Sequence, residues 1–215
     1  MATVLLTVPH AACPRVMSDP LHSCDTAAPR AAQELYAALE RVGISAQLLV
    51  ADVPRKYSDM NRYESRGSEW RTKVEAAMSG HGKRPKLLLD VHSFPARSAE
   101  SPDDVFYGKA MVVMILEKFT TELGKKIIIG GGKEVIQYSR NFPWQAEMVK
   151  YVEKTARMPI GMTYGSLAND LMVRAEQSGI PSALLEFSED LNRQNMKQIC
   201  DALAKFVSES VAGER

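Results

Sequence analysis

Three apolar runs in this sequence each end in a side chain that is able to bind a metal ion or to transfer a proton. The residues that end these runs are His10, His92 and Glu186. An apolar run that stops abruptly at polar residues is typical of a buried parallel strand that leaves the sheet at a site. Ligands of open α/β sheets bind outside the carboxyl ends of the strands. The sequence therefore predicts that two histidines and one carboxylate meet at one edge of a sheet.

The two histidines are candidate zinc ligands. A hydrolytic zinc site takes three protein ligands from His, Asp, Glu and Cys and leaves a fourth position for water. His10 and His92 supply two ligands, and the third is Asp25 or His22, which lie close together in the chain. Asp25 also stands where a helix is predicted to begin, so a simple N-cap is an equal alternative for this residue.

A structural zinc site is a rival arrangement of the same region. His10, Cys13, His22 and Cys24 offer the ligand set of a Cys₂His₂ site. The short separation between His22 and Cys24 fits no usual zinc-finger spacing, so the sequence favours the hydrolytic arrangement.

Glu186 is the candidate general base. A carboxylate near a bound metal ion takes a proton from the metal's water, whose pKa the ion has lowered. The alternative is a solvated glutamate at a strand end, but the apolar residues 183–185 indicate a central strand. Asp90 lies two residues before His92, on the same face of the strand, and is a candidate to orient that histidine.

A charged segment after the second predicted strand carries the candidate substrate-binding residues. It includes Arg55 and the run Asp59-Met60-Asn61-Arg62. A guanidinium offers a planar fork of donors that matches a carboxylate, and an asparagine amide adds a directional donor. Asn61, Arg62 and, more weakly, Arg55 therefore point to an acidic substrate, although most surface Asn-Arg pairs are only solvated.

The remaining pattern predicts the elements that position these residues. Strands are expected at residues 3–8, 45–50, 86–95 and 182–186, and helices at 26–42, 69–78, 145–156, 166–178 and 192–211. Residues 105–116 fit a strand or the start of a helix, 117–123 a helix and 126–129 a strand. This alternation predicts one α/β domain over residues 1–215. It has three layers, with a mixed, mostly parallel sheet covered by helices.

Composition and charge narrow the classes of function. The 215 residues include 27 Lys and Arg against 26 Asp and Glu, and this net charge of +1 predicts no nucleic-acid and no membrane partner. No run reaches the ~20 apolar residues of a membrane span, and no secretory leader is recognised. An odd count of three cysteines favours a reduced, cytoplasmic setting.

Taken in order, the motifs resemble one enzyme family. The order is Val8-Pro9-His10, Asp25, Arg55-x-x-x-Asp59-x-Asn61-Arg62, Asp90-x-His92-Ser93-x-Pro95 and Glu186. It resembles the N-formylglutamate amidohydrolase family, which is similar to the zinc carboxypeptidases and aspartoacylase-like hydrolases. The resemblance implies a zinc carboxypeptidase-like fold and a zinc ion held by His10, an acidic residue and His92. It also implies that Asn61 and Arg62 bind the substrate carboxylate and that Glu186 is the base.

Two positions depart from the family pattern. Ala11-Ala12 stand where the family has Ser-Gly, and Asp25-Thr26-Ala27 stands where it has Asp-x-Asp. The second departure leaves the choice of the third ligand open. Tyr164 is a further candidate to reach over the site and bind substrate.

The sequence thus predicts a cytoplasmic, zinc-dependent amidohydrolase. Its substrate would be an N-acyl (N-formyl) amino acid or a related small amide that bears a carboxylate. Glu186 and Arg62 are its expected catalytic residues. Two alternatives are a carboxypeptidase-like metallopeptidase and a non-catalytic binding protein on the same fold. Because His₂-carboxylate sites also bind other divalent ions, the sequence does not determine the native metal.

Overall fold

The protein is built on a six-stranded sheet. The computed structural model describes residues 4–14, 24–80, 84–94, 112–116, 127–129, 133–135, 142–158, 160–164 and 169–212. In this part of the chain the strand order is β2-β1-β3-β8-β4-β7. The bounds are β1 Val4–Val8, β2 Ala46–Val50, β3 Leu87–Phe94, β4 Val112–Leu116, β7 Ile160–Tyr164 and β8 Ser182–Ser188.

Strand direction changes once across this sheet. β2, β1, β3 and β8 pair in parallel, β4 is antiparallel to β8, and β7 is parallel to β4. The predicted mixed, mostly parallel sheet is confirmed. All eight residues of β3 are buried, which explains why its first three residues are apolar on both faces. β5 (Ile127–Ile129) and β6 (Lys133–Val135) form a separate antiparallel pair.

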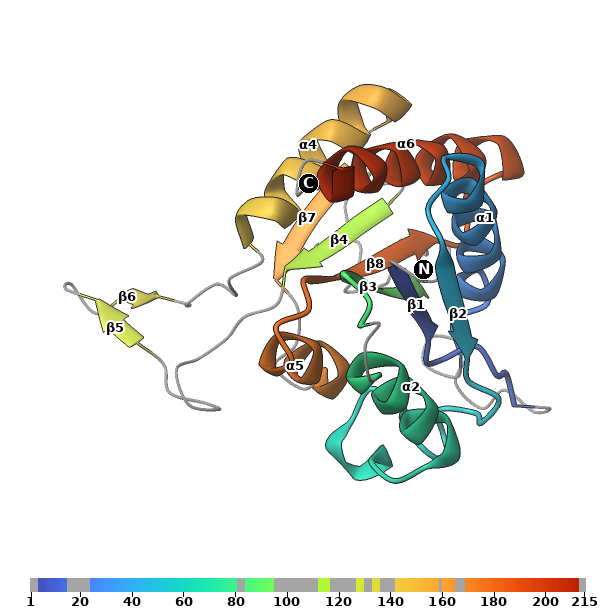
Figure 1. The fold of residues 1–215 in the computed structure, drawn as a ribbon, viewed down its shortest axis with the longest axis vertical. Coiled ribbons are helices and arrows are strands. Elements are labelled where there is room, and N and C mark those ends of the chain that lie inside the picture. Colours follow the sequence, from blue (N-terminus) through green and yellow to red (C-terminus); the bar gives the residue numbers. More distant parts are fainter. Residues whose placement is uncertain are drawn as a thin grey trace, which may run out of the picture.

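Helices cover both faces of the sheet (Figure 1). α1 (Ala28–Arg41), α4 (Phe142–Ala156) and α6 (Arg193–Ala212) lie on one face, and α2 (Glu69–Ser79) and α5 (Asp170–Gln177) lie on the other. Alternate residues of β3 belong to the two cores: Leu89 packs in the core under α1 and α6, whereas Leu88 packs in the core under α2 and α5. Because side chains alternate along a strand, Asp90 and His92 point to the same face as Leu88.

Local sequence signals set the ends of the helices. Ser68 caps α2, because its side chain accepts a hydrogen bond from the Arg71 backbone N–H. α1 ends at Arg41, and Gly43 follows with a φ of +75°, a left-handed conformation that glycine adopts without strain. The predicted helix at 117–123 lies outside the described residues.

Two of the three cysteines are joined. Cys13 and Cys24 form a disulfide with their Cα atoms 5.0 Å apart, and Cys200 is free and buried. The predicted reduced state is therefore wrong for this pair, because an odd count does not tell which cysteines meet in space. The cytoplasmic setting stays a prediction, but the cysteines no longer support it, because a disulfide is the oxidised form. The rival Cys₂His₂ site is also excluded, since the bonded sulfurs offer no thiolate.

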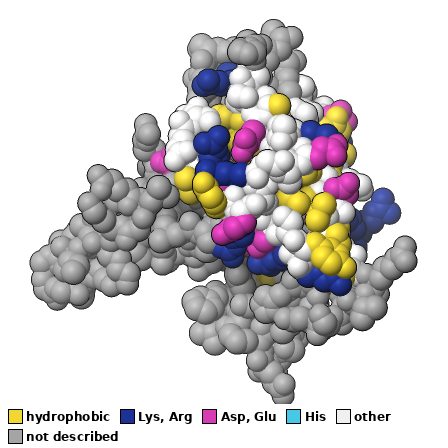
Figure 2. Space-filling model, turned by 90° about the horizontal axis from the view of Figure 1, so that it is seen from below, with side chains coloured by type: hydrophobic (Ala, Val, Ile, Leu, Met, Phe, Trp, Pro, Cys, Tyr) yellow, Lys and Arg dark blue, Asp and Glu magenta, His cyan; other side chains and the backbone are white. Residues whose placement is uncertain are grey.

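One face of the molecule carries charged side chains of both signs (Figure 2). Figure 2 shows basic and acidic side chains near one another on the face seen there, without a continuous region of one sign. Among the described residues, we find no helix with the length and hydropathy of a membrane span.

Thiol titration tests the disulfide. The protein isolated without reductant should react with about one equivalent of a chromogenic thiol reagent in denaturant, because Cys200 alone is free, and with about three after reduction. In the folded protein this reaction should be slow, since burial raises the pKa of the Cys200 thiol. Three equivalents before reduction would contradict the disulfide.

Candidate metal centre

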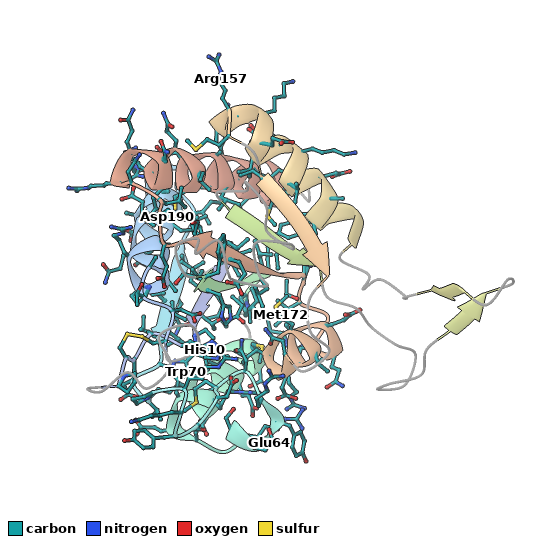
Figure 3. The ribbon with its side chains drawn as sticks, turned by 180° about the vertical axis from the view of Figure 1, so that it is seen from behind. His10, Glu64, Trp70, Arg157, Met172 and Asp190 are labelled. Carbon is teal, nitrogen blue, oxygen red and sulfur yellow. A yellow bond between two sulfur atoms is a disulfide. The ribbon has the colours of Figure 1, made fainter. Side chains whose placement is uncertain are left out.

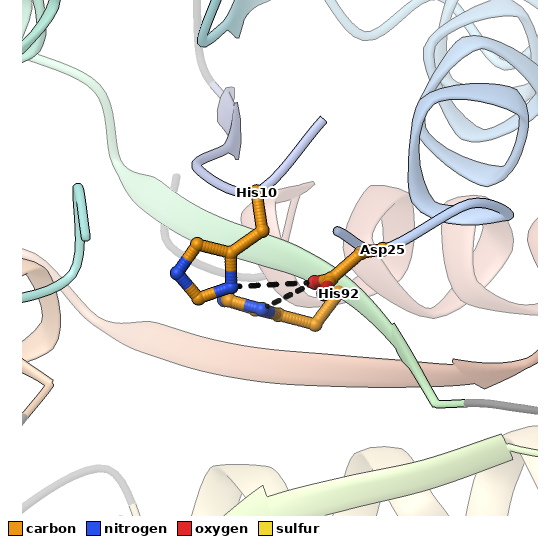
Figure 4. A group of neighbouring side chains, drawn as sticks. All are labelled: His10, Asp25 and His92. Atoms are coloured by element: carbon orange, nitrogen blue, oxygen red, sulfur yellow. Dashed lines mark hydrogen bonds and ion pairs between the residues drawn. The ribbon is translucent and has the colours of Figure 1, made fainter. Parts of the chain in front are cut away.

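Two histidines and an aspartate converge at the carboxyl end of the central strands (Figure 4; His10 is also labelled in Figure 3). His10 follows β1, Asp25 precedes α1 and His92 lies in β3, and their ligand atoms all lie within 4.8 Å of one another. Asp25 Oδ2 is 3.5 Å from His10 Nδ1 and 2.8 Å from His92 Nδ1. All three side chains are buried. The structure thus brings together the predicted ligand set, with Asp25 as the acidic member.

The outer nitrogen of each histidine is held by a different carboxylate. His10 Nε2 is 2.7 Å from Asp59 Oδ1, and His92 Nε2 is 3.0 Å from Asp90 Oδ2. Such carboxylate partners fix the ring orientation and leave the inner nitrogen for a metal. The inner His10 Nδ1 is buried and has no hydrogen-bond partner in the part of the chain that the structure describes. These residues therefore fit a zinc ion, with His₂-carboxylate ligation and a fourth position for water.

Asp25 is placed by its neighbours and not by a helix cap. The N-cap position of α1 is Ala27, which makes no side-chain cap bond, so the predicted N-cap role of Asp25 is wrong. Its carboxylate instead contacts His92 and accepts the Ser93 backbone N–H at 3.3 Å. The next backbone N–H groups are also held, because Glu189 accepts from Thr26 at 3.0 Å and Ser93 Oγ accepts from Ala27 at 3.1 Å.

The close contacts between these three side chains shift the pKa values of Asp25 and His92. Burial by itself would raise the pKa of the Asp25 carboxyl, but the contacts with His10 and His92 outweigh it and hold the pKa well below its usual range. For His92, burial would lower the pKa, but Asp90 and Asp25 raise it well above its ordinary value. A metal ion must therefore displace a proton from His92, so its affinity rises with pH.

Asp90 is completely buried and satisfied by donors from three segments. Thr7 Oγ1 donates to it at 2.6 Å, Asn61 Nδ2 at 3.2 Å and Asn169 Nδ2 at 3.1 Å. Its contact with His92 confirms the predicted carboxylate partner of that histidine. Thr7 and Asn169 were not singled out from the sequence, because neither lies in a motif and Asn169 is 79 residues away from Asp90.

Asn61 lies in this buried network. Its amide Nδ2 is 2.8 Å from His92 Nε2 as well as 3.2 Å from Asp90 Oδ2. Because His92 Nε2 donates to Asp90, the Asn61 amide nitrogen cannot also donate to the ring, and Asn61 belongs to the network through its bond to Asp90. Its predicted contact with a substrate carboxylate stays a prediction.

Two guanidinium groups flank the Asp59 carboxylate. Arg55 Nε is 3.2 Å and Arg62 Nε is 3.3 Å from Asp59 Oδ2. Burial would raise the pKa of Asp59, but the bond to His10 and the charge of Arg55 lower it below its usual range. Because both arginine side chains are partly exposed, they present positive charge next to the candidate metal centre.

Glu186 lies beside His92 on the neighbouring strand. The two residues are partners in the parallel register of β3 and β8, so their side chains point to the same face. Burial raises the pKa of Glu186 to about 8, and although His92 opposes this rise, Asp25 and Asp90 add to it. A carboxyl group with a pKa near neutrality is suited to accept and return a proton.

Two predicted site residues cannot be compared with the geometry. His22 lies outside the described residues. Tyr164 is the last residue of β7, and its predicted reach over the site concerns a side chain outside the described part.

Solved structures provide the comparison with known proteins. A gene product of Agrobacterium tumefaciens is similar with a TM-score of 0.63 and 15% identity, covering 99% of this chain and 92% of that one. N-formylglutamate amidohydrolase from Ralstonia eutropha JMP134 has a TM-score of 0.52 and 14% identity, covering 100% and 95%. The chain shares its fold with N-formylglutamate amidohydrolase. The fold thus supports the resemblance of the motifs to this family.

The same architecture also occurs in a second amidase. N-acetylmuramoyl-L-alanine amidase from Clostridium difficile 630 has a TM-score of 0.53 and 10% identity, covering 99% of this chain and 97% of that one. No protein-family model and no curated protein matches the sequence. At these identities the likeness to N-formylglutamate amidohydrolase establishes the fold alone, and activity must be argued from the site.

Loss of the Asp59 charge should weaken metal binding. Asp59→Asn removes the carboxylate partner of His10, so zinc affinity is expected to fall about 10- to 100-fold, measured by competition with a chromophoric chelator. Glu64→Gln is the matched control, because Glu64 is an exposed carboxylate of the same connection. An equal loss of affinity in both variants would contradict the role of Asp59.

Glu186 should make the stability of the metal-free protein depend on pH. Its folded-state pKa of about 8 lies above the ordinary 4.5, so its favourable contribution is complete below about pH 4.5 and is lost as the pH rises through 8. Glu186→Gln should therefore raise the free energy of unfolding by about 2 to 4 kcal/mol at pH 9 and change it little at pH 4.

Urea unfolding in chelator measures this difference. Glu153→Gln on α4 removes an exposed carboxylate and controls for net charge. The raised pKa of Glu186 is refuted if Glu186→Gln has the same effect on stability at both pH values.

Proposed function

We propose that this protein is a zinc-dependent amidohydrolase. Its substrate would be an N-acyl amino acid, with N-formyl as the first candidate, or a related small amide that bears a carboxylate. The observation that carries the proposal is the buried His10–Asp25–His92 group, in which His10 Nδ1 lacks a hydrogen-bond partner among the described residues. A buried nitrogen without a hydrogen bond is costly, and Asp25 Oδ2, at 3.5 Å, is too distant to give a good one. A metal ion between the two atoms would remove that cost.

Each residue of the site has a definite role in the proposed reaction. Zinc held by His10, Asp25 and His92 would polarise the amide carbonyl and lower the pKa of water. Glu186 takes a proton from the attacking water and returns it to the leaving nitrogen, so that the amide and water give an acid and an amine. Asp59 and Asp90 keep the two imidazole rings in place.

The choice of a carboxylate-bearing substrate rests on the two arginines. Arg62 and Arg55 both flank Asp59, which itself holds His10, so their positive charges lie next to the centre. A substrate carboxylate bound by Arg62 would orient the scissile bond, and this orientation is a large part of catalysis in such sites. Arg62 is for this reason the proposed substrate-binding and catalytic arginine, with Arg55, Asn61 and Tyr164 as further candidates for substrate contact.

Metal content is the first test of the proposal. Purified wild-type protein should hold about one zinc ion per chain, and His92→Ala should lose it, because three protein ligands make the site. The zinc-loaded wild type is then assayed on N-formyl and N-acetyl amino acids, and on muramoyl peptides as the competing substrate class. Hydrolysis of the muramoyl peptides alone would replace the proposed substrate. Absence of zinc from both proteins, even after zinc is supplied, would refute the enzyme and favour a binding protein.

Glu186→Gln tests the general base. The amide keeps the size of the side chain but accepts no proton, so kcat should fall about 10²- to 10⁴-fold. Zinc content should match the wild type, because Glu186 is not among the three candidate ligands. Glu153→Gln should leave both quantities unchanged, and retention of kcat in Glu186→Gln would contradict the assignment.

A further inference from the structure

Arg71 is a charged residue with a completely buried side chain. Its guanidinium donates from Nη2 to Asp170 Oδ2 at 2.6 Å, and from Nη1 to the backbone oxygens of Met60 at 3.1 Å and Arg62 at 3.3 Å. A buried ion pair is often no more stable than well-packed apolar residues of similar volume. The pair therefore points to a requirement other than stability.

The backbone oxygens of three consecutive residues accept hydrogen bonds from this pair of residues. Arg71 binds the oxygens of Met60 and Arg62, and the Asp170 backbone N–H donates to the oxygen of Asn61 at 2.7 Å. The connection between β2 and α2 to which they belong contains only one short 3₁₀ turn. Ser65 Oγ also donates to the oxygens of Met60 at 3.2 Å and Arg62 at 2.7 Å. Since buried backbone groups need partners, Arg71 and Asp170 hold the main chain here from outside the connection, and Ser65 holds it from within.

The Asn61 side chain of the same connection is held by the buried Asp90 carboxylate of β3. Asn169, next to Asp170, and Asn61 both donate to Asp90 Oδ2. The backbone around Asn61 is thus fixed by the ion pair, and its side chain is fixed by the buried carboxylate. Arg62 follows directly, and its partly exposed guanidinium lies next to the candidate metal centre through Asp59.

We propose that Arg71, held by Asp170, is a positioning residue for the binding of the substrate carboxylate. The inference rests on the proposed function, in which Arg62 binds that carboxylate. By fixing the backbone of residues 60–62 from α2 and α5, the ion pair sets the separation between the Arg62 guanidinium and the metal centre. It thereby selects the distance between carboxylate and scissile amide in the substrate. Its described contacts include none of the three candidate metal ligands, so zinc binding should not depend on it.

Arg66 provides a matched control. It binds the same Asp170 carboxylate, with Nε 2.8 Å from Oδ2, but within the described residues it donates to no backbone oxygen of residues 60–62. Arg66→Met and Arg71→Met each remove one guanidinium from Asp170 and leave the other. Any difference between the two variants therefore reports on the backbone contacts and not on the ion pair as such.

Steady-state kinetics of the zinc-loaded proteins test the positioning role. The substrates are the N-acyl amino acid that the wild type hydrolyses fastest and the methyl ester of that compound, which lacks the charge. Arg71→Met should raise KM for the acid about 10- to 100-fold and lower kcat by a smaller factor, because the scissile bond is less well oriented, with neither change for the ester. Arg66→Met should change KM less than about threefold, and zinc content should equal that of the wild type in both.

A second variant, Arg71→Lys, provides the test if Arg71→Met does not fold. Arg71→Lys keeps a positive charge next to Asp170 but lacks the planar fork, in which Nη2 donates to the carboxylate while Nη1 donates to two carbonyls. It should show a smaller rise in KM for the acid than Arg71→Met, and again none for the ester. Equal KM changes in Arg71→Met and Arg66→Met, or a fall in kcat alone, would overturn the positioning role and leave the proposed function intact.

Hydrogen exchange separates the inference from the proposed function. If the wild type hydrolyses no amide, the proposed function fails, but the backbone of residues 59–66 still reports on Arg71. Exchange in this segment at least about tenfold faster in Arg71→Met than in Arg66→Met would support the positioning of the backbone. Equal exchange in the two variants would overturn it.

Discussion

The buried carboxylate of Asp90 joins the parts of the chain that make the site. It accepts hydrogen bonds from Thr7 of β1, from Asn61 after β2 and from Asn169 before α5, and it contacts His92 in its own strand. A charge without partners in the interior would cost several kcal/mol, so the sheet, the connection and α5 must all be in place for this residue to be tolerated. Folding of this region and assembly of the site are therefore one event.

Three acidic side chains lie around His92, and they explain the shifted pKa values in the site. Asp25 and Asp90 both contact this histidine, and Glu186 is its register partner on β8. Without a metal, the balance is kept by protons, because the pKa of His92 is raised and that of Glu186 is about 8. A divalent cation would supply the same positive charge without these protons, and it would free Glu186 to act as a base.

Short-range patterns predicted the sheet and the residues at its edge, because an apolar run that ends at His92 or Glu186 is visible within one strand. The contacts that place the substrate-binding connection were not predictable in this way. Arg71 has the sequence context of an exposed helix residue, and its partner Asp170 is 99 residues away. The direction of the Asn61 amide depends on a buried carboxylate that only the folded sheet provides. The reversal of β4 and the disulfide likewise depend on which segments meet in space.

The Cys13–Cys24 disulfide also acts on the unfolded chain. It joins residues 11 positions apart, and the two candidate ligands His10 and Asp25 stand just outside its ends. In the oxidised unfolded chain, the effective concentration of one ligand at the position of the other is therefore on the order of millimolar, as across a short flexible linker. Such a chain retains part of its affinity for zinc, and a ligand that also binds the unfolded state stabilises the folded state less. Reduction would add the Cys13 and Cys24 thiolates to the ligands of the unfolded chain, and thiolates bind zinc more tightly than a carboxylate does. The same zinc concentration would accordingly raise the unfolding temperature of the oxidised protein by more than that of the reduced one.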